Sequence, residues 1–115
     1  MSRFVVGIPS VTKTIKIKRP GREEEQFTAD IRVRDLDDQD ELEKKRVAGE
    51  LKGHAHMRED VLAIGGCATG AGDDVSSSDD ATLIDAMFKD PYARMGLMRA
   101  WHEVQSGLPE AVEKN

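Results

Sequence analysis

Three side chains that bind soft metals lie close together in this sequence: His54, His56 and Cys67. Their spacing matches none of the paired Cys or His patterns that bind zinc, so exposed histidines beside a loop are the simpler interpretation. Cys67 with either histidine is also a candidate nucleophile and base, but the cysteine falls in a glycine-rich stretch that offers nothing to orient it. We therefore expect no catalytic activity, no metal site and no cofactor.

The glycine-rich stretch from Gly65 to Ser78 has the composition of a phosphate-binding loop but not its details. No Lys-Ser or Lys-Thr follows its last glycine, and Asp73 with Asp74 would repel a phosphate. These carboxylates, together with Asp79 and Asp80, also lack the alternating oxygen ligands of a calcium loop. Fixing so many glycines and serines is entropically costly. We expect a mobile linker.

Composition narrows the remaining functions. The 115 residues suit one domain, and with 38% hydrophobic and 4% aromatic residues the core is thin, so self-association would be a source of further burial. The formal charge of −5 argues against nucleic acid as the general partner. No apolar run approaches the roughly 20 residues that span a bilayer, and the start does not have the form of a signal peptide. We expect a soluble cytoplasmic protein with no membrane partner.

The first secondary structure that the sequence predicts is a β-hairpin. From residue 11 to residue 34, apolar and polar side chains alternate with a period of two on both sides of a Pro20-Gly21 turn. The pattern predicts two antiparallel strands with one apolar face, and residues 4–8 are apolar enough for a third strand. The apolar face is formed by Val11, Ile15, Ile17, Phe27, Ala29, Ile31 and Val33.

Basic residues are concentrated in the same hairpin: Lys13, Lys16, Lys18, Arg19, Arg22, Arg32 and Arg34. A basic face can bind nucleic acid, but no aromatic residue interleaves with these charges to stack on bases. We expect this face to meet acidic protein partners. A small nucleic-acid-binding or regulatory module that uses the basic face is the alternative.

Helical patterns follow. An acidic start at Asp35–Asp40 predicts a mostly polar helix to about Leu51, and Met57, Val61 and Ile64 predict a short amphipathic helix from about His56 to Ile64. A third helix carries Leu83, Ile84, Met87 and Phe88 and meets a fourth at Asp90-Pro91. The fold class is therefore α+β: an N-terminal antiparallel β-hairpin, with up to three strands, followed by about four α-helices. We expect one domain over residues 1–107 and a short flexible tail over residues 108–115.

The sequence predicts where the last helix begins and ends. Asp90 can cap its N-terminus before Pro91, and Gly107 followed by Pro109 predicts its C-terminal stop. Two methionines, Met95 and Met98, fall among its polar positions. A second helix could cover them, or they could form a surface that contacts another protein; both interpretations stay open. One arc predicts the core, with Trp101 at its centre: Ala93, Leu97, Ala100, Trp101 and Val104.

Four segments, in order, resemble the phage tail assembly chaperones of long-tailed bacteriophages and prophages. Phe27–Arg34 is similar to the family's Phe-Thr-Ala strand, and Glu59–Gly66 to its short helix running into glycines. Leu83–Arg94 is similar to its helix–proline–helix corner, and Ala100–Gly107, followed by a terminal Lys-Asn, to its ending. The resemblance covers roughly residues 10 to 115, and the order of the segments carries more weight than any one of them.

The resemblance implies a non-catalytic chaperone in the cytoplasm of a bacterial host, absent from the mature virion. Such a protein binds the long helical tape-measure protein and helps tail-tube proteins polymerise around it. We expect the partner-binding side chains to come from the last helix and from the hairpin: Met95, Met98, Arg94, Arg99, Lys16, Lys18, Arg32 and Arg34.

Overall fold

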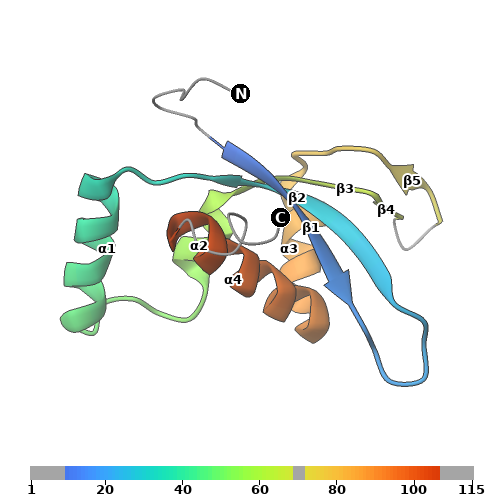
Figure 1. Cartoon of the computed structure of the whole chain (residues 1–115), viewed down its shortest axis with the longest axis horizontal. Helices are drawn as coiled ribbons and strands as arrows, with labels where there is room; N and C mark the ends of the chain where they lie inside the picture. Colours follow the sequence, from blue (N-terminus) through green and yellow to red (C-terminus); the bar gives the residue numbers. More distant parts are fainter. Residues whose placement is uncertain (1–9, 69–71, 107–115) are drawn as a thin grey trace, which may run out of the picture.

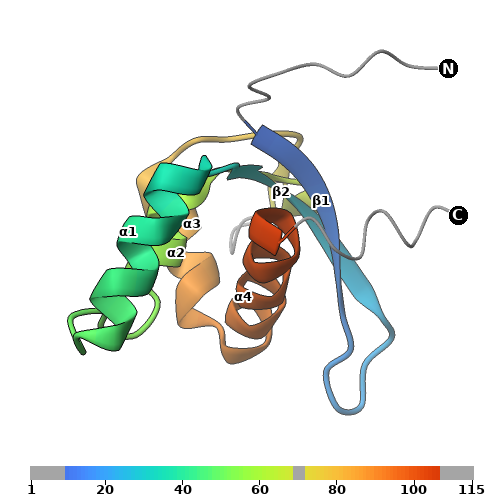
Figure 2. The ribbon, with the colours of Figure 1, turned by 60° about the vertical axis from the view of Figure 1, so that its left-hand side comes forward.

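The computed structural model describes residues 10–68 and 72–106. Over these ranges, the N-terminal hairpin joins one later strand in a three-stranded antiparallel sheet, and the chain also forms four helices, so the expected α+β class is confirmed (Figure 1). Figure 2 shows the helices gathered on one side of the hairpin. Over the same two ranges, no helix has the length and apolar character needed to cross a membrane. The third strand expected at residues 4–8 and the tail at 108–115 lie outside the described residues.

The hairpin forms as the alternation predicts. Strand β1 (Ser10–Ile17) pairs antiparallel with β2 (Glu25–Arg32) along its whole length. Gly21 adopts a φ of 75° in the turn between them, a backbone conformation that glycine reaches without strain. The side chains that face the helices are the expected ones, with Ile15, Phe27, Ala29 and Ile31 buried and Val11, Ile17 and Val33 partly buried.

The third strand comes from an unexpected place. The expected helix from His56 to Ile64 is wrong in its second half, because α2 (Ala55–Asp60) stops at Asp60 and the chain continues as β3 (Val61–Gly65). Strand β3 pairs antiparallel with β2, and Val61 and Ile64 become buried there. These β-branched residues favour a strand, and pairing with β2 outweighs the local helical spacing.

The glycine-rich stretch is also more ordered than expected. Within its described part, β4 (Cys67–Ala68) pairs with β5 (Asp74–Val75). Ile64 and Ser78 exchange two backbone hydrogen bonds of 2.8 Å, which fasten the returning chain to β3. A Cβ at Gly65 would lie 2.1 Å from the Ser76 carbonyl oxygen, so only glycine admits this return. The prediction of a mobile linker is therefore wrong for these residues.

The first helix, α1 (Leu36–Val47), touches the core lightly, as its polar sequence predicts. The Asp35 side chain caps it by accepting a 2.8 Å hydrogen bond from the Asp38 amide. None of its residues is buried. It ends at Val47, before the expected Leu51, where Gly49 turns the chain with a φ of 74°. In Figure 1, α1 stands apart at one end of the molecule.

The last two helices meet at a tight corner. Helix α3 (Ala81–Lys89) is capped by Asp80, and α4 (Pro91–Ser106) by Asp90, whose Oδ1 accepts hydrogen bonds from the amides of Tyr92 and Ala93. The buried residues of α4 are those of the predicted arc: Ala93, Leu97, Ala100, Trp101 and Val104. The core position of Trp101 is therefore confirmed. The helix stop expected at Gly107 lies outside the described residues.

Helix α4 lies against β1 at an unusually close approach. A Cβ at Gly96 would lie 2.5 Å from Ile15 Cγ2, nearer than real Cβ atoms come. Gly96 therefore sets the distance between the last helix and the first strand, and any side chain at this position would push the two elements apart.

We expect Gly96→Ala to destabilise the protein even though alanine is the better helix former by about 1 kcal/mol. Overpacking against Ile15 costs about 1–3 kcal/mol and outweighs that gain. In an Ile15→Ala background the obstructing methyl is gone, so Gly96→Ala should become neutral or stabilising. Urea unfolding of the four proteins measures both effects, and an equal cost in the two backgrounds would contradict the proposed contact.

We expect the amides of Ile64, Gly66 and Ser78 to exchange slowly, because each donates a 2.8 Å backbone hydrogen bond that fastens the returning chain. The internal control is Ser77, whose amide donates no backbone hydrogen bond to another described residue. Native-state hydrogen exchange should show rates slower by roughly tenfold or more at the three bonded amides. If these three amides exchanged as fast as that of Ser77, the segment would be a mobile linker after all.

Candidate functional site

Two of the arginines expected to bind a partner are instead held by a buried carboxylate. Arg32 donates from Nε at 2.9 Å and from Nη2 at 2.7 Å to Oδ1 of Asp60. Arg34 donates from Nε at 2.6 Å to Oδ2 of the same residue. Arg32 and Arg34 are therefore tied to the fold by Asp60, and their expected role in partner binding stays a prediction.

Asp60 has a third donor, the Trp101 indole, whose Nε1 lies 2.7 Å from Oδ2. The carboxylate is 0% exposed, so its loss of hydration must be offset by these charge-assisted hydrogen bonds. The donors come from the end of β2 and from the middle of α4, while Asp60 is the last residue of α2. The cluster therefore joins the end of the hairpin, α2 and α4.

The sequence held one overlooked signal of this cluster. Asp60 lies three residues after Met57 and directly before Val61, on the apolar side of the pattern that starts the helix. A charged residue at such a position predicts a buried ion pair. Its partners lie 26 and 28 residues earlier, and nothing in the spacing identifies them.

Other basic residues of the hairpin are also engaged. Lys13 lies on the helix side of β1, not on the polar face, and its Nζ is 3.0 Å from Oε1 of Glu103 on α4. Arg19 and Arg22 both pair with Glu25 across the hairpin turn. These ion pairs offset part of the positive charge of the basic face, although 58% of the Arg22 side chain stays exposed.

The other basic residues expected to bind a partner differ in exposure. Lys16, Lys18 and Arg99 are exposed. Arg94 is half-buried, and its Nε donates a 2.6 Å hydrogen bond to the Phe88 carbonyl, so it closes the end of α3. Its expected role in partner binding stays a prediction.

The two methionines differ. Met95 is 63% exposed, whereas Met98 packs partly against the core. Met98 therefore fits the first interpretation, packing within the fold. Met95 presents its side chain to solvent, as the second interpretation requires. Met95 lies on the α4 surface opposite the buried arc, close to the half-exposed Tyr92.

His54, His56 and Cys67, the candidates for metal binding or catalysis, each lie in a different environment. His54 stacks on Phe88 at 5.1 Å between ring centroids, and His56 meets Trp101 edge to face at 5.3 Å. Burial raises the pKa of the Cys67 thiol, which disfavours the nucleophilic thiolate. Over the described ranges, no three His, Cys, Asp or Glu side chains are close enough together to hold a metal ion.

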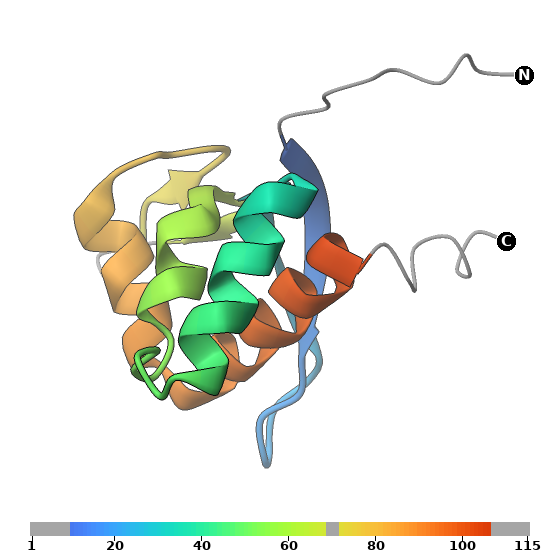
Figure 3. The ribbon, with the colours of Figure 1, turned by 90° about the vertical axis from the view of Figure 1, so that its left-hand side faces the viewer.

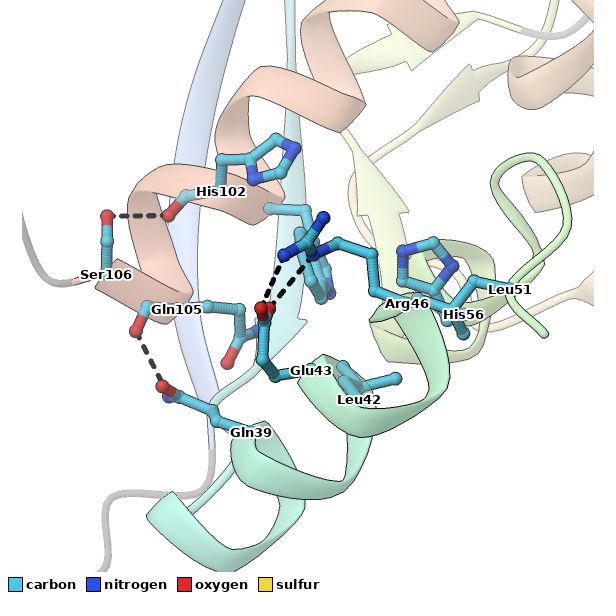
Figure 4. Close-up of a pocket in the computed structure, with 10 residues that line it drawn as sticks. Gln39, Leu42, Glu43, Arg46, Leu51, His56, His102, Gln105 and Ser106 are labelled. Carbon is cyan, nitrogen blue, oxygen red and sulfur yellow. Dashed lines mark hydrogen bonds and ion pairs between the residues drawn. The ribbon is translucent and has the colours of Figure 1, made fainter. Parts of the chain in front are cut away.

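A cavity of about 360 Å³ lies between α1, α2 and α4. Figure 3 shows the three helices side by side, and Figure 4 shows the side chains around the cavity. Gln39 spans one end, donating hydrogen bonds from Nε2 to the carbonyls of Arg34 and Gln105 at 3.0 and 3.1 Å. Leu42 and Leu51 provide apolar lining on the α1 side, and Trp101 on the α4 side.

One polar atom in this cavity has no partner. His56 Nδ1 is buried without a hydrogen bond. Burial, followed by the nearby Arg34 guanidinium, lowers the pKa of His56, so its imidazole is neutral at pH 7. The neutral ring lies beside Trp101 and two leucines, and the rest of the lining is polar or charged, including the Glu43–Arg46 ion pair and the Ser106 hydroxyl.

No protein-family model, no curated protein and no solved structure matches this chain.

We expect Asp60→Asn to destabilise the protein by about 3–5 kcal/mol, because it leaves the half-buried Arg32 and Arg34 without their counter-charge. The matched control is Asp85→Asn, which removes an exposed carboxylate that pairs with Arg58 and should cost less than about 1 kcal/mol. Urea unfolding compares the two. Equal effects would mean that the Asp60 cluster adds no more than a surface pair.

Proposed function

We propose that this chain is a non-catalytic phage tail assembly chaperone that binds the tape-measure protein and promotes assembly of tail-tube subunits around it. The observation that carries the proposal is Met95, a large flexible apolar side chain held in solvent on α4. A methionine surface adapts to varied apolar partners, which suits a long helical chain. The resemblance of four sequence segments supplies the class of partner. Such a chaperone would act in the cytoplasm of the bacterial host and be absent from the finished tail.

The choice of α4 rests on how firmly it is held. Its buried arc packs in the core, and Glu103 and Trp101 tie it to β1 and to Asp60. Helix α1 also exposes large apolar side chains, Leu36 and Val47, but buries none of its residues. A preorganised surface loses less conformational entropy on binding, so α4 is the better platform.

The alternative, a nucleic-acid-binding or regulatory module on the basic face of the hairpin, has less support. Arg32 and Arg34 are bound to Asp60, and Arg19 and Arg22 pair with Glu25. Lys16 and Lys18 remain, and two lysines neutralise few phosphates. A very long open reading frame beside this gene would favour the chaperone, and an adjacent operator sequence would favour the regulator.

We expect Met95→Lys to lower co-purification with the tape-measure protein roughly tenfold, because it places a charge in an apolar contact. The substituted side chain is exposed, so the free energy of unfolding should change by less than about 0.5 kcal/mol. Where a very long open reading frame lies beside this gene, the test co-expresses its product with a tagged form of this chain and measures the amount retained on the tag.

The matched control is Leu36→Lys, the same kind of change at an exposed apolar position on α1. It should leave co-purification intact. Loss with Leu36→Lys alone would move the contact to α1 and overturn the choice of α4. Absence of any complex with the unsubstituted chain would overturn the chaperone proposal itself.

A further inference from the structure

Strand β1 is an open edge of the sheet. The strand order is β1-β2-β3, and all eight residues of β1 pair with β2 on one side. Among the described strands, none pairs with its other side. The outer edge of β3, by contrast, is met by Ser78 through two backbone hydrogen bonds with Ile64. An open edge presents alternating N–H and C=O groups that can pair with another strand.

A groove of about 690 Å³ follows this edge. Six consecutive residues of β1, Val11 to Lys16, line one side of it. Because successive side chains of a strand point to opposite faces, a groove that meets all six must run along the backbone edge itself. The other side is α4, which contributes residues at helical spacing: Gly96, Arg99, Ala100 and Glu103. Figure 2 shows β1 beside α4.

The charge of the groove is opposite to that of the protein. Its lining carries Lys13, Lys16 and Arg99 against one acidic residue, Glu103, in a chain whose formal charge is −5. Glu103 pairs with Lys13, so the exposed Lys16 and Arg99 are the cations that face an incoming ligand. The exposed Lys18 follows just after the end of β1. This arrangement selects a ligand with negative charge.

We propose that this groove binds an extended acidic segment of another protein, which pairs with β1 as an added strand. Strand addition forms backbone hydrogen bonds along the outer edge of β1, and carboxylates on the segment meet Lys16 and Arg99. A second copy of β1 fits poorly because it would bring its own lysines into a basic groove. Nucleic acid fits poorly because no aromatic side chain lines the groove for stacking.

The probe is a fluorescent peptide of alternating Glu and Val residues, about as long as β1, titrated with the full chain by anisotropy. Two further peptides carry N-methyl groups on one or the other alternate set of residues. A strand at a sheet edge directs every second amide toward its neighbour, so one methylated peptide should bind roughly tenfold more weakly and the other nearly as well as the parent. Equal affinities of the two methylated peptides, or no binding of the parent, overturn the proposal.

Charge variants test whether the peptide binds in the groove beside β1. Lys16→Glu should weaken binding roughly fivefold or more, whereas Lys44→Glu should leave it nearly unchanged. Lys44 is the matched control because it is an exposed lysine on α1, away from the groove, and makes the same change in net charge. Equal effects of the two variants, or tighter binding of a single-stranded oligothymidylate that Lys16→Glu abolishes, overturn strand addition by an acidic peptide.

Discussion

The buried carboxylate of Asp60 is the constraint on which the rest of the structure depends. It collects two guanidinium groups from the end of β2 and the indole N–H of Trp101 from α4. A charge this deep is tolerable only with several well-placed donors, and each donor fixes the position of one element. With a thin hydrophobic core, the polar cluster supplies the specificity that apolar packing would provide in a larger domain.

That cluster also decides which surfaces remain for partners. Arg34 is nearly buried against Asp60, Arg32 is partly covered there, and Glu25 pairs with Arg19 and Arg22, so Lys16 and Lys18 are the exposed hairpin cations outside these ion pairs. Two surfaces of different chemistry are left. The exposed face of α4 is apolar around Met95, and the edge of β1 is basic. The two proposals assign one ligand to each surface: an apolar helix to α4 and an acidic extended segment to β1.

Helix α1 is the element least tied to the body. It buries no residue, and its attachment rests on Gln39, on the partly buried Leu42 and on the cavity side of α4. Elements with few buried contacts open at low free energy. The cavity beneath α1, with the unpaired Nδ1 of His56, lies at the weakest contact in the fold.

The sequence by itself determined the features that depend on local periodicity and capping: the hairpin, the polar helix after Asp35, the Asp90-Pro91 corner and the buried arc around Trp101. Tertiary structure alone decided the rest. Val61 and Ile64 form a strand because β2 offers them partners, and Gly65 packs under Ser76 because the chain returns there. Arg32, Arg34 and Asp60 looked like surface charges because their pairing spans 26 to 28 residues. Local spacing reports which face a side chain takes, but only the assembled fold brings distant charges within hydrogen-bonding distance.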